Sequence, residues 1–95
     1  MEIGYFCNAT NWTNKPYTDI VNNIREIAEY CDQNSWDSIW FTEHHFSHEG
    51  MEICPNPLML SADIAARTNS IRIGQAATII TFWNPIRVAE DIALL

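Results

Sequence analysis

Three short apolar runs in this chain alternate with stretches that have the periodicity of amphipathic helices. The runs are residues 2–7, 38–41 and 71–80. Between the first two, apolar residues recur on one helix face, namely Ile20, Ile24, Ile27, Ala28 and Cys31. A strand, a helix of about 15 residues and a second strand form a βαβ unit, in which the strands are parallel and the crossover is right-handed. The alternation therefore predicts an α/β fold with a parallel sheet.

The predicted helices have recognisable starts. Thr18 can cap the first helix with its hydroxyl group. Asn56-Pro57 and Asn84-Pro85 each place an asparagine cap before a proline at the first helical position, where the missing N–H is not needed. We expect the second helix to bury Leu58, Ala62, Ala65 and Ala66. We expect the third helix to bury Val88, Ile92 and Leu95.

Three strand–helix units are too few for a complete barrel of this type. A (β/α)8 barrel needs roughly 250 residues, whereas this chain has 95. A three-stranded parallel sheet would leave two open edges, and Leu94-Leu95 ends the third helical pattern without a glycine or a polar cap. We expect residues 1–95 to be the N-terminal (βα)3 portion of a single (β/α)8 TIM-type barrel, truncated within the third helix and inactive alone.

The composition is that of a folded globular protein, with 47% hydrophobic and 18% charged residues. The net charge of -7 argues against nucleic acid or an anionic membrane surface as a partner. No apolar run is long enough to span a membrane, and the first residues lack the features of a signal peptide. Three widely spaced cysteines without a C-x-x-C pair fit reduced thiols rather than disulfides. These features predict a cytoplasmic protein.

The second predicted strand leads directly into three ionisable residues, Glu43-His44-His45. In a parallel sheet, functional sites are built at the carboxyl ends of the strands, because the loops there vary while the strands fix position. A carboxylate raises the pKa of a neighbouring histidine and burial lowers it, so such groups can titrate near neutrality. We take this segment as the candidate site. The alternative is that Glu43 forms an ordinary ion pair and the histidines fill a loop.

A metal site is a weaker interpretation of the same segment. His44 and His48, flanked by Glu43 and Glu49, have the spacing of ligands on one helix face. The segment follows a strand and enters a loop, however, and no H-E-x-x-H motif is present, so the pattern lacks the structural context of a metal centre. We expect no metal.

Gly74 is the single glycine of the third predicted strand, and Gln75-Ala76-Ala77 follows it. A glycine inside a strand marks either close approach of a ligand to the backbone or tight helix–sheet packing, and the sequence leaves both open. No G-x-G-x-x-G and no P-loop occurs, so a dinucleotide or nucleoside triphosphate site has no support. Aromatic residues are frequent near the predicted strands, namely Phe6, Trp36, Trp40, Phe41, Phe46, Phe82 and Trp83. They can either pack in the core or form the wall of a site for a planar cofactor.

Four segments together resemble the bacterial luciferase-like flavin monooxygenases. They are the opening strand EIGYF, the segment WDSIWFTEHHF, the strand IRIGQAATII and the segment NPIRVAEDIALL. The E-H-H-F signature followed by an N-P-x-R-x-A-E-D helix is far more specific than either part alone. The fold of that family is a (β/α)8 barrel, which agrees with the alternation of strands and helices described above.

The resemblance implies roles for individual residues. His44 corresponds to the histidine with which the catalytic luciferase subunit handles protons around the flavin. Glu43 corresponds to a residue at the wall of the flavin pocket, and Phe6 to a position on the first strand that lines the substrate pocket. Ala76 and Ala77 correspond to a pair that borders the flavin ring and is joined by a cis peptide bond.

The resemblance also implies an activity. A two-component monooxygenase receives reduced FMN from a separate flavin reductase and uses O₂ to oxidise a small organic substrate, commonly as a homo- or heterodimer. The alternatives are an F420-dependent oxidoreductase of the same fold, which transfers hydride without oxygen, and a non-catalytic flavin-binding or subunit-pairing protein. The double histidine favours FMN, and His44 favours a catalytic subunit, since the non-catalytic luciferase subunit tends to carry asparagine there.

Overall fold

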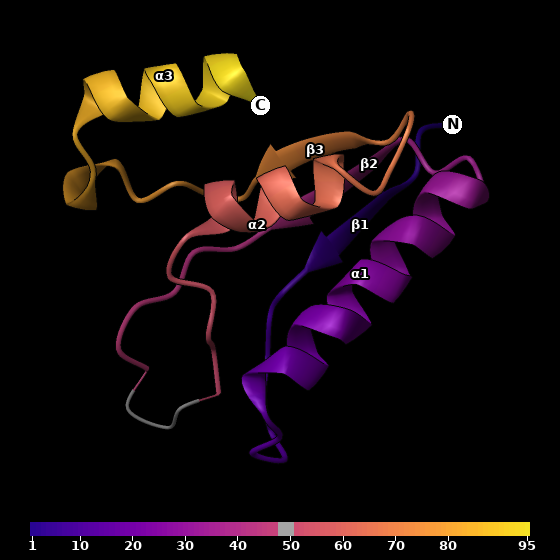
Figure 1. The fold of residues 1–95 in the computed structure, drawn as a ribbon, viewed down its shortest axis with the longest axis horizontal. Coiled ribbons are helices and arrows are strands. Elements are labelled where there is room, and N and C mark those ends of the chain that lie inside the picture. Colours follow the sequence, from indigo (N-terminus) through magenta and orange to yellow (C-terminus); the bar gives the residue numbers. More distant parts are fainter. Residues whose placement is uncertain (48–50) are drawn as a thin grey trace.

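A computed structural model describes residues 1–47 and 51–95 of the chain (Figure 1). The elements in chain order are β1 (Gly4–Cys7), α1 (Tyr17–Gln33), β2 (Ser38–Phe41), α2 (Pro57–Ala65), β3 (Arg72–Gln75), a 3-10 helix (Ile80–Phe82) and α3 (Pro85–Leu94). The strands are parallel and lie in the order β1-β2-β3. The predicted α/β alternation with a parallel sheet is confirmed.

The register of the strands separates the two faces of the sheet. Cys7 pairs with Phe41, and both side chains are buried. Phe6 pairs with Trp40, and these side chains are 61% and 43% exposed. Because neighbouring residues of a strand point to opposite faces, one face of the sheet forms the core. The opposite face, which we call the open face, carries Phe6, Ser38, Trp40 and Gly74.

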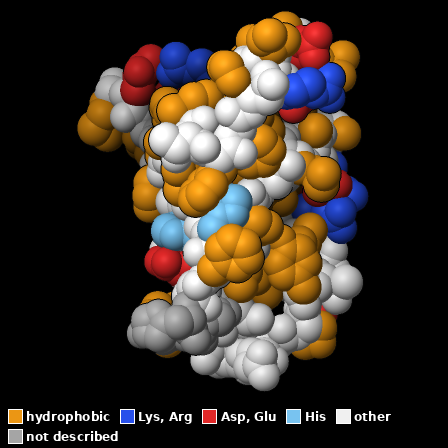
Figure 2. All heavy atoms as spheres, turned by 90° about the vertical axis from the view of Figure 1, so that its left-hand side faces the viewer, with side chains coloured by type: hydrophobic (Ala, Val, Ile, Leu, Met, Phe, Trp, Pro, Cys, Tyr) orange, Lys and Arg blue, Asp and Glu red, His pale blue; other side chains and the backbone are white. Residues whose placement is uncertain are grey.

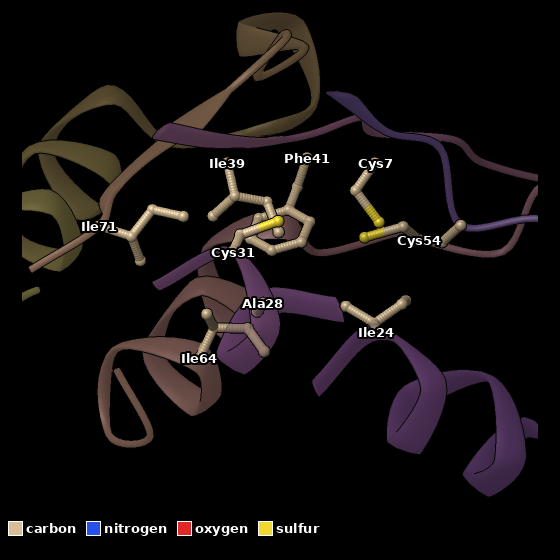
Figure 3. Packing of buried hydrophobic residues seen from close by; sticks show 10 residues of the cluster. Cys7, Ile24, Ala28, Cys31, Ile39, Phe41, Cys54, Ile64 and Ile71 are labelled. Atoms are coloured by element: carbon tan, nitrogen blue, oxygen red, sulfur yellow. The ribbon is translucent and has the colours of Figure 1, made fainter. Parts of the chain in front are cut away.

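The core lies between the sheet and the helices α1 and α2 (Figure 3). The predicted face of α1 is confirmed, since Ile24, Ala28 and Cys31 are buried and Ile20 and Ile27 are partly buried against them. Ile64 of α2 is fully buried in the same cluster. The three cysteines are buried free thiols, as the sequence predicted.

The predicted N-cap of α1 is wrong. The helix begins at Tyr17, so Thr18 lies inside it, and Pro16 precedes it without a side-chain capping bond. The carbonyl of Pro16 accepts the Asp19 N–H at 3.0 Å, so the backbone closes this turn without a hydroxyl acceptor. The caps of the other two helices are confirmed, because Asn56 accepts the Met59 N–H and Asn84 accepts those of Ile86 and Arg87.

The predicted buried face of α2 is wrong for two of its four residues, whereas Leu58 is buried and Ala65 is partly buried. Ala62 and Ala66 are exposed, and the buried residues are Pro57, Leu58, Ser61 and Ile64. A polar residue can face the sheet here because the Ser61 hydroxyl accepts a hydrogen bond from Gln75 Nε2 at 2.5 Å. The rotation of the helix follows this bond and the burial of the larger Ile64, rather than the alanine pattern.

The third strand is shorter than predicted and ends at Gln75 instead of Ile80. Its neighbour β2 ends at Phe41, whose carbonyl accepts the Ala76 N–H at 2.7 Å. Because β2 ends there, the residues after Ala76 have no residue of β2 with which to continue the sheet. The chain then leaves the sheet and forms the 3-10 helix, in which Ile80 and Phe82 are exposed.

Asp32 and Arg25 of α1 make polar contacts with distant segments of the fold. The Asp32 carboxylate accepts the backbone N–H groups of Asn69, Ser70 and Ile71 at 2.8–2.9 Å. These bonds, the first two above all, lower the pKa of Asp32 to about 2. Arg25 donates two hydrogen bonds to Asp63 of α2, at 2.7 and 2.9 Å. The turn that enters β3 is thereby held against the end of α1.

The third helix lies apart from the sheet (Figure 1). Val88 is buried as predicted, whereas Ile92 and Leu95 of the same predicted face are 55% and 44% exposed. None of the helices in residues 1–47 and 51–95 is long and apolar enough to cross a membrane.

Candidate active site at the carboxyl ends of the strands

The three ionisable residues of the E-H-H segment follow β2 after a single residue, Thr42, and so lie at its carboxyl end as predicted. Glu43 is buried, whereas His44 and His45 are partly exposed. The strands of Figure 1 all point toward the same side of the molecule, and Figure 2 views that side, where histidine side chains reach the surface among hydrophobic ones. The parallel sheet thus delivers these groups to the end at which loops from different strands meet.

Glu43 connects two loops through its carboxylate, whose side chain is 0% exposed. Oε1 accepts hydrogen bonds from His45 Nε2 at 2.6 Å and from Trp83 Nε1 at 2.8 Å. Oε2 accepts the backbone N–H of Ile79 at 2.7 Å. Glu43, which closely follows the end of β2, is therefore the acceptor that holds the segment between β3 and α3.

Two opposing effects act on the pKa of Glu43. Burial raises the pKa, and the hydrogen bonds from His45, the Ile79 N–H and Trp83 lower it. The hydrogen bonds prevail, so the pKa lies below its ordinary value and the group is an anion at neutral pH. An ionised carboxylate only accepts hydrogen bonds, so His45 must present an N–H at Nε2.

His45 is held on two sides. Its Nε2 is bonded to Glu43, and its ring centroid lies 4.7 Å from that of Phe82 with the planes tilted by 56°. Glu43 therefore pairs with its neighbour His45 through a hydrogen bond, as the alternative interpretation expects of a neighbouring side chain. With one nitrogen bonded to a carboxylate and the ring packed against an aromatic side chain, His45 has a structural role in these loops.

His44 differs from its neighbour in the surroundings of its ring nitrogens. Its backbone N–H donates to the Cys54 carbonyl at 2.9 Å, and its Nδ1 lies 3.1 Å from Glu52 Oε2. The Nε2 atom is buried and has no hydrogen-bond partner among the described residues. A buried ring nitrogen without a partner is costly unless something else binds it. His44 is therefore the histidine of this segment whose buried ring nitrogen lacks a partner among the described residues, and its role in proton exchange stays a prediction.

The predicted cofactor-binding pair follows β3 at the same end of the sheet. The Ala76–Ala77 peptide bond is cis, as the resemblance implies. Ala76 is partly buried and Ala77 is exposed. The Glu43–Ile79 hydrogen bond lies two residues further along, so the E-H-H segment and this pair belong to one connected structure. Their contact with a flavin stays a prediction.

Phe6 lies on the open face, in register with Trp40 and Gly74. A side chain on Gly74 would meet the Trp40 ring, since its Cβ would lie 2.5 Å from Trp40 Cε3. Helix–sheet packing is therefore not the reason for this glycine, which instead makes room for the ring of the neighbouring strand. The assignment of Phe6 to a substrate pocket stays a prediction.

The residues weighed as metal ligands lie only partly within the described ranges. His48 and Glu49 lie outside the described residues, while His44 and Glu43 have the partners given above. Within residues 1–47 and 51–95, no group of three potential ligands is close enough to hold a metal ion.

Three residues that contact the E-H-H segment or its neighbours were not predicted from the sequence. Trp83 was grouped with the aromatic residues, although its indole N–H bonds to Glu43. The sequence patterns do not single out Glu52 or Asn8. Glu52 contacts His44, and Asn8 contacts Glu52 across a sequence separation that no local pattern reveals. Only Asn8, which directly follows β1, could have been indicated by its position in the sequence.

The whole chain, residues 1–95, matches the sequence profile of the luciferase-like monooxygenases. The protein belongs to this family. It is 36% identical over 91 residues to the alkanal monooxygenase beta chain of Photorhabdus laumondii, covering 96% of this chain and 27% of the relative. It is 33% identical over 75 residues to the oxygenase component of the flavin-dependent trigonelline monooxygenase of Acinetobacter baylyi, covering 79% and 20%.

A solved monooxygenase structure confirms the fold. The oxygenating constituent of 3,6-diketocamphane monooxygenase from Pseudomonas putida, a type II Baeyer–Villiger enzyme in complex with FMN, superposes with a TM-score of 0.88. It is 24% identical and covers 97% of this chain and 25% of that protein. The three βα units therefore correspond to the N-terminal quarter of a luciferase-like barrel. The chain spans between 20% and 27% of the length of these relatives.

Proposed function

We propose that residues 1–95 are the first three βα units of an FMN-dependent, luciferase-like monooxygenase that uses O₂ to oxidise a small organic substrate. The observation that carries this proposal is the buried Nε2 of His44, which has no partner in the described part of the chain. It lies at the carboxyl end of a barrel sheet, where enzymes of this architecture bind their ligands. Family membership supports flavin as the group that takes the place beside it.

The residues at this end of the sheet suit a flat, apolar ring system. Ala76 and Ala77 have small side chains, and Ala77 is exposed, so a planar ring could approach the backbone there. The exposed Phe6 and Trp40 add aromatic surface on the open face. Bound flavin would supply the redox chemistry and the reaction with oxygen. Glu43 would act by holding the segment of Ile79 in position, and His44 by exchanging a proton at Nε2.

The proposal includes a complete barrel and partners. Residues 1–95 would form part of one barrel domain whose further strands cover the open sheet edges. A separate reductase would supply reduced FMN. A dimeric assembly is supported by the likeness to an alkanal monooxygenase beta chain, whose name implies a further chain.

A flavin titration combined with oxygen uptake on the complete protein tests the proposed function. Reduced FMN should bind and the protein should consume O₂ in a substrate-dependent way. Reduction of F420 without oxygen uptake would instead identify the hydride-transferring alternative. Flavin binding without either reaction would identify a non-catalytic flavin-binding or subunit-pairing protein.

Substitution of Ala77 by leucine should weaken flavin binding. The added side chain would occupy the space proposed for the ring, so we expect the Kd for reduced FMN to rise about several-fold to a hundredfold. Because Ala77 is exposed, leucine should not overpack the core, and the melting temperature should stay close to that of the wild type.

The matched control is Ala66→Leu, an exposed alanine at the end of α2 that precedes β3. This variant should keep both its affinity and its melting temperature. An unchanged flavin affinity in Ala77→Leu would remove this residue from the cofactor site.

A further inference from the structure

We propose that Glu52 is the positioning residue for His44, and that it selects the ring tautomer in which Nε2 is the proton acceptor. This inference rests on the proposed function, because it concerns how His44 performs proton exchange. It adds a residue that lies outside the E-H-H segment, in the loop between β2 and α2.

The geometry of the pair determines where the proton of a neutral His44 ring lies. Glu52 Oε2 is 3.1 Å from His44 Nδ1. A carboxylate oxygen at this distance attracts an N–H and repels a nitrogen lone pair, so the contact favours the tautomer with the hydrogen on Nδ1. The other nitrogen, the buried Nε2, then has a lone pair and no partner among the described residues. Without Glu52, neither tautomer would be selected by this contact.

Glu52 is itself held by a chain of side chains that begins at the end of β2. The buried Thr42 donates its hydroxyl hydrogen to Asn8 Oδ1 at 2.9 Å. Asn8 Nδ2 in turn lies 3.5 Å from Glu52 Oε1 and donates to it. The donors and acceptors thus follow one another from Thr42 through Asn8 and Glu52 to His44. Of the two Glu52 carboxylate oxygens, Oε1 faces Asn8 and Oε2 faces His44.

The backbone supports the same arrangement. Thr10 and Glu52 form an antiparallel bridge, and the neighbouring Ile53 N–H donates to the Ala9 carbonyl at 3.1 Å. The segment after β1 therefore lies beside the segment that carries Glu52. On the other side, the His44 N–H donates to the Cys54 carbonyl. Both members of the pair are attached to backbone that is fixed by hydrogen bonds, which is what orientation of a ring requires.

The chain of donors predicts an unusual result for the isosteric variant Glu52→Gln. The amide oxygen should accept from Asn8, so the amide NH₂ group would face His44 Nδ1. That nitrogen would then have to accept, and the hydrogen of the ring would move to Nε2. The double variant Asn8→Asp/Glu52→Gln should reverse this. The carboxylate introduced at position 8 accepts both from Thr42 and from the amide NH₂ group, which leaves the amide oxygen for His44.

The experiment uses the complete protein labelled with ¹⁵N in its histidine rings, since ring ¹⁵N shifts distinguish a protonated from an unprotonated nitrogen. The His44 signals are identified by their loss in His44→Asn. We expect the hydrogen on Nδ1 in the wild type, on Nε2 in Glu52→Gln, and again on Nδ1 in the double variant. Flavin-dependent turnover should fall about tenfold to a hundredfold in Glu52→Gln and recover in the double variant, while the Kd for FMN stays within about twofold in both.

Glu2→Gln is the matched control, because Glu2 is an exposed carboxylate whose partner is Arg72. It should change neither the tautomer nor turnover. An unchanged His44 tautomer in Glu52→Gln, or a turnover loss that the double variant does not recover, would overturn the proposal. Wild-type protein that takes up no oxygen with reduced FMN would refute the proposed function instead, while the expected tautomer changes would still support the positioning of His44.

Discussion

Replacing His44 by alanine in the complete protein should lower turnover by about 10²-fold or more, the usual scale for a group that transfers protons in a reaction. The variant loses the buried Nε2 that has no partner among the described residues. Flavin binding should survive, because the predicted contacts of Ala76 and Ala77 are unaffected. Steady-state oxygen uptake gives the turnover, and quenching of flavin fluorescence gives the affinity.

The neighbouring histidine provides the comparison for this prediction. His45 donates to Glu43 and packs against Phe82. His45→Ala should therefore mainly lower the stability of the protein and have a smaller effect on the rate of the chemical step. His48, which lies outside the described residues, is also expected to matter less than His44. Full activity of His44→Ala would end its assignment as the proton-exchanging residue. A larger loss of turnover in His45→Ala would mean that the site is built around the other ring.

Replacing Glu43 by alanine should destabilise the complete protein by on the order of 3–5 kcal/mol, because three hydrogen-bond donors lose their acceptor and each unsatisfied buried donor costs about 1–3 kcal/mol. The side chain is 0% exposed, and its loss leaves His45 without a partner at that nitrogen. It also leaves the N–H groups of Ile79 and Trp83 without their acceptor. Glu43→Gln should cost less, about 1–3 kcal/mol, because its amide oxygen still accepts. Thermal and denaturant unfolding measure both changes.

The contribution of Glu43 should depend on pH in a definite direction. Its pKa is lower in the folded protein than the ordinary value, because the hydrogen bonds outweigh burial. The stabilisation is therefore complete above the ordinary carboxyl pKa of about 4.3 and is lost as the pH falls toward the folded value. The stability of the wild type should thus approach that of Glu43→Gln as the medium is acidified below that value.

An exposed glutamate serves as the control for the Glu43 variants. Glu90 pairs with Arg87 on α3, and its side chain is 58% exposed. Glu90→Gln should change stability by less than about 0.5–1 kcal/mol, as is usual for surface ion pairs. Wild-type stability in Glu43→Ala would show that the bonds to Ile79 and Trp83 do not hold the segment between β3 and α3.

Local patterns in the sequence were sufficient for the framework of this protein. The periodicity of α1, the asparagine caps before Pro57 and Pro85, and the order of the elements all depend on neighbouring residues. Hydrophobic periodicity and backbone chemistry act over a few residues, so the sequence displays them directly. The same holds for the place of Glu43 and His44, because they follow a strand without an intervening loop. The cis bond between Ala76 and Ala77 came from the family resemblance alone.

Contacts between distant segments were decided only by the tertiary structure. Glu43 meets Trp83 across 40 positions, and Gln75 reaches Ser61 and so turns α2 away from its alanine face. The ring of Trp40 explains Gly74, and the loop that returns to β1 brings Glu52 to His44. No local period encodes such pairs, since the paths of the loops and the register of the sheet determine which side chains meet. The ionisable residues of the site were therefore visible in the sequence, whereas the different surroundings of the His45 and His44 rings depend on partners from other strands and loops.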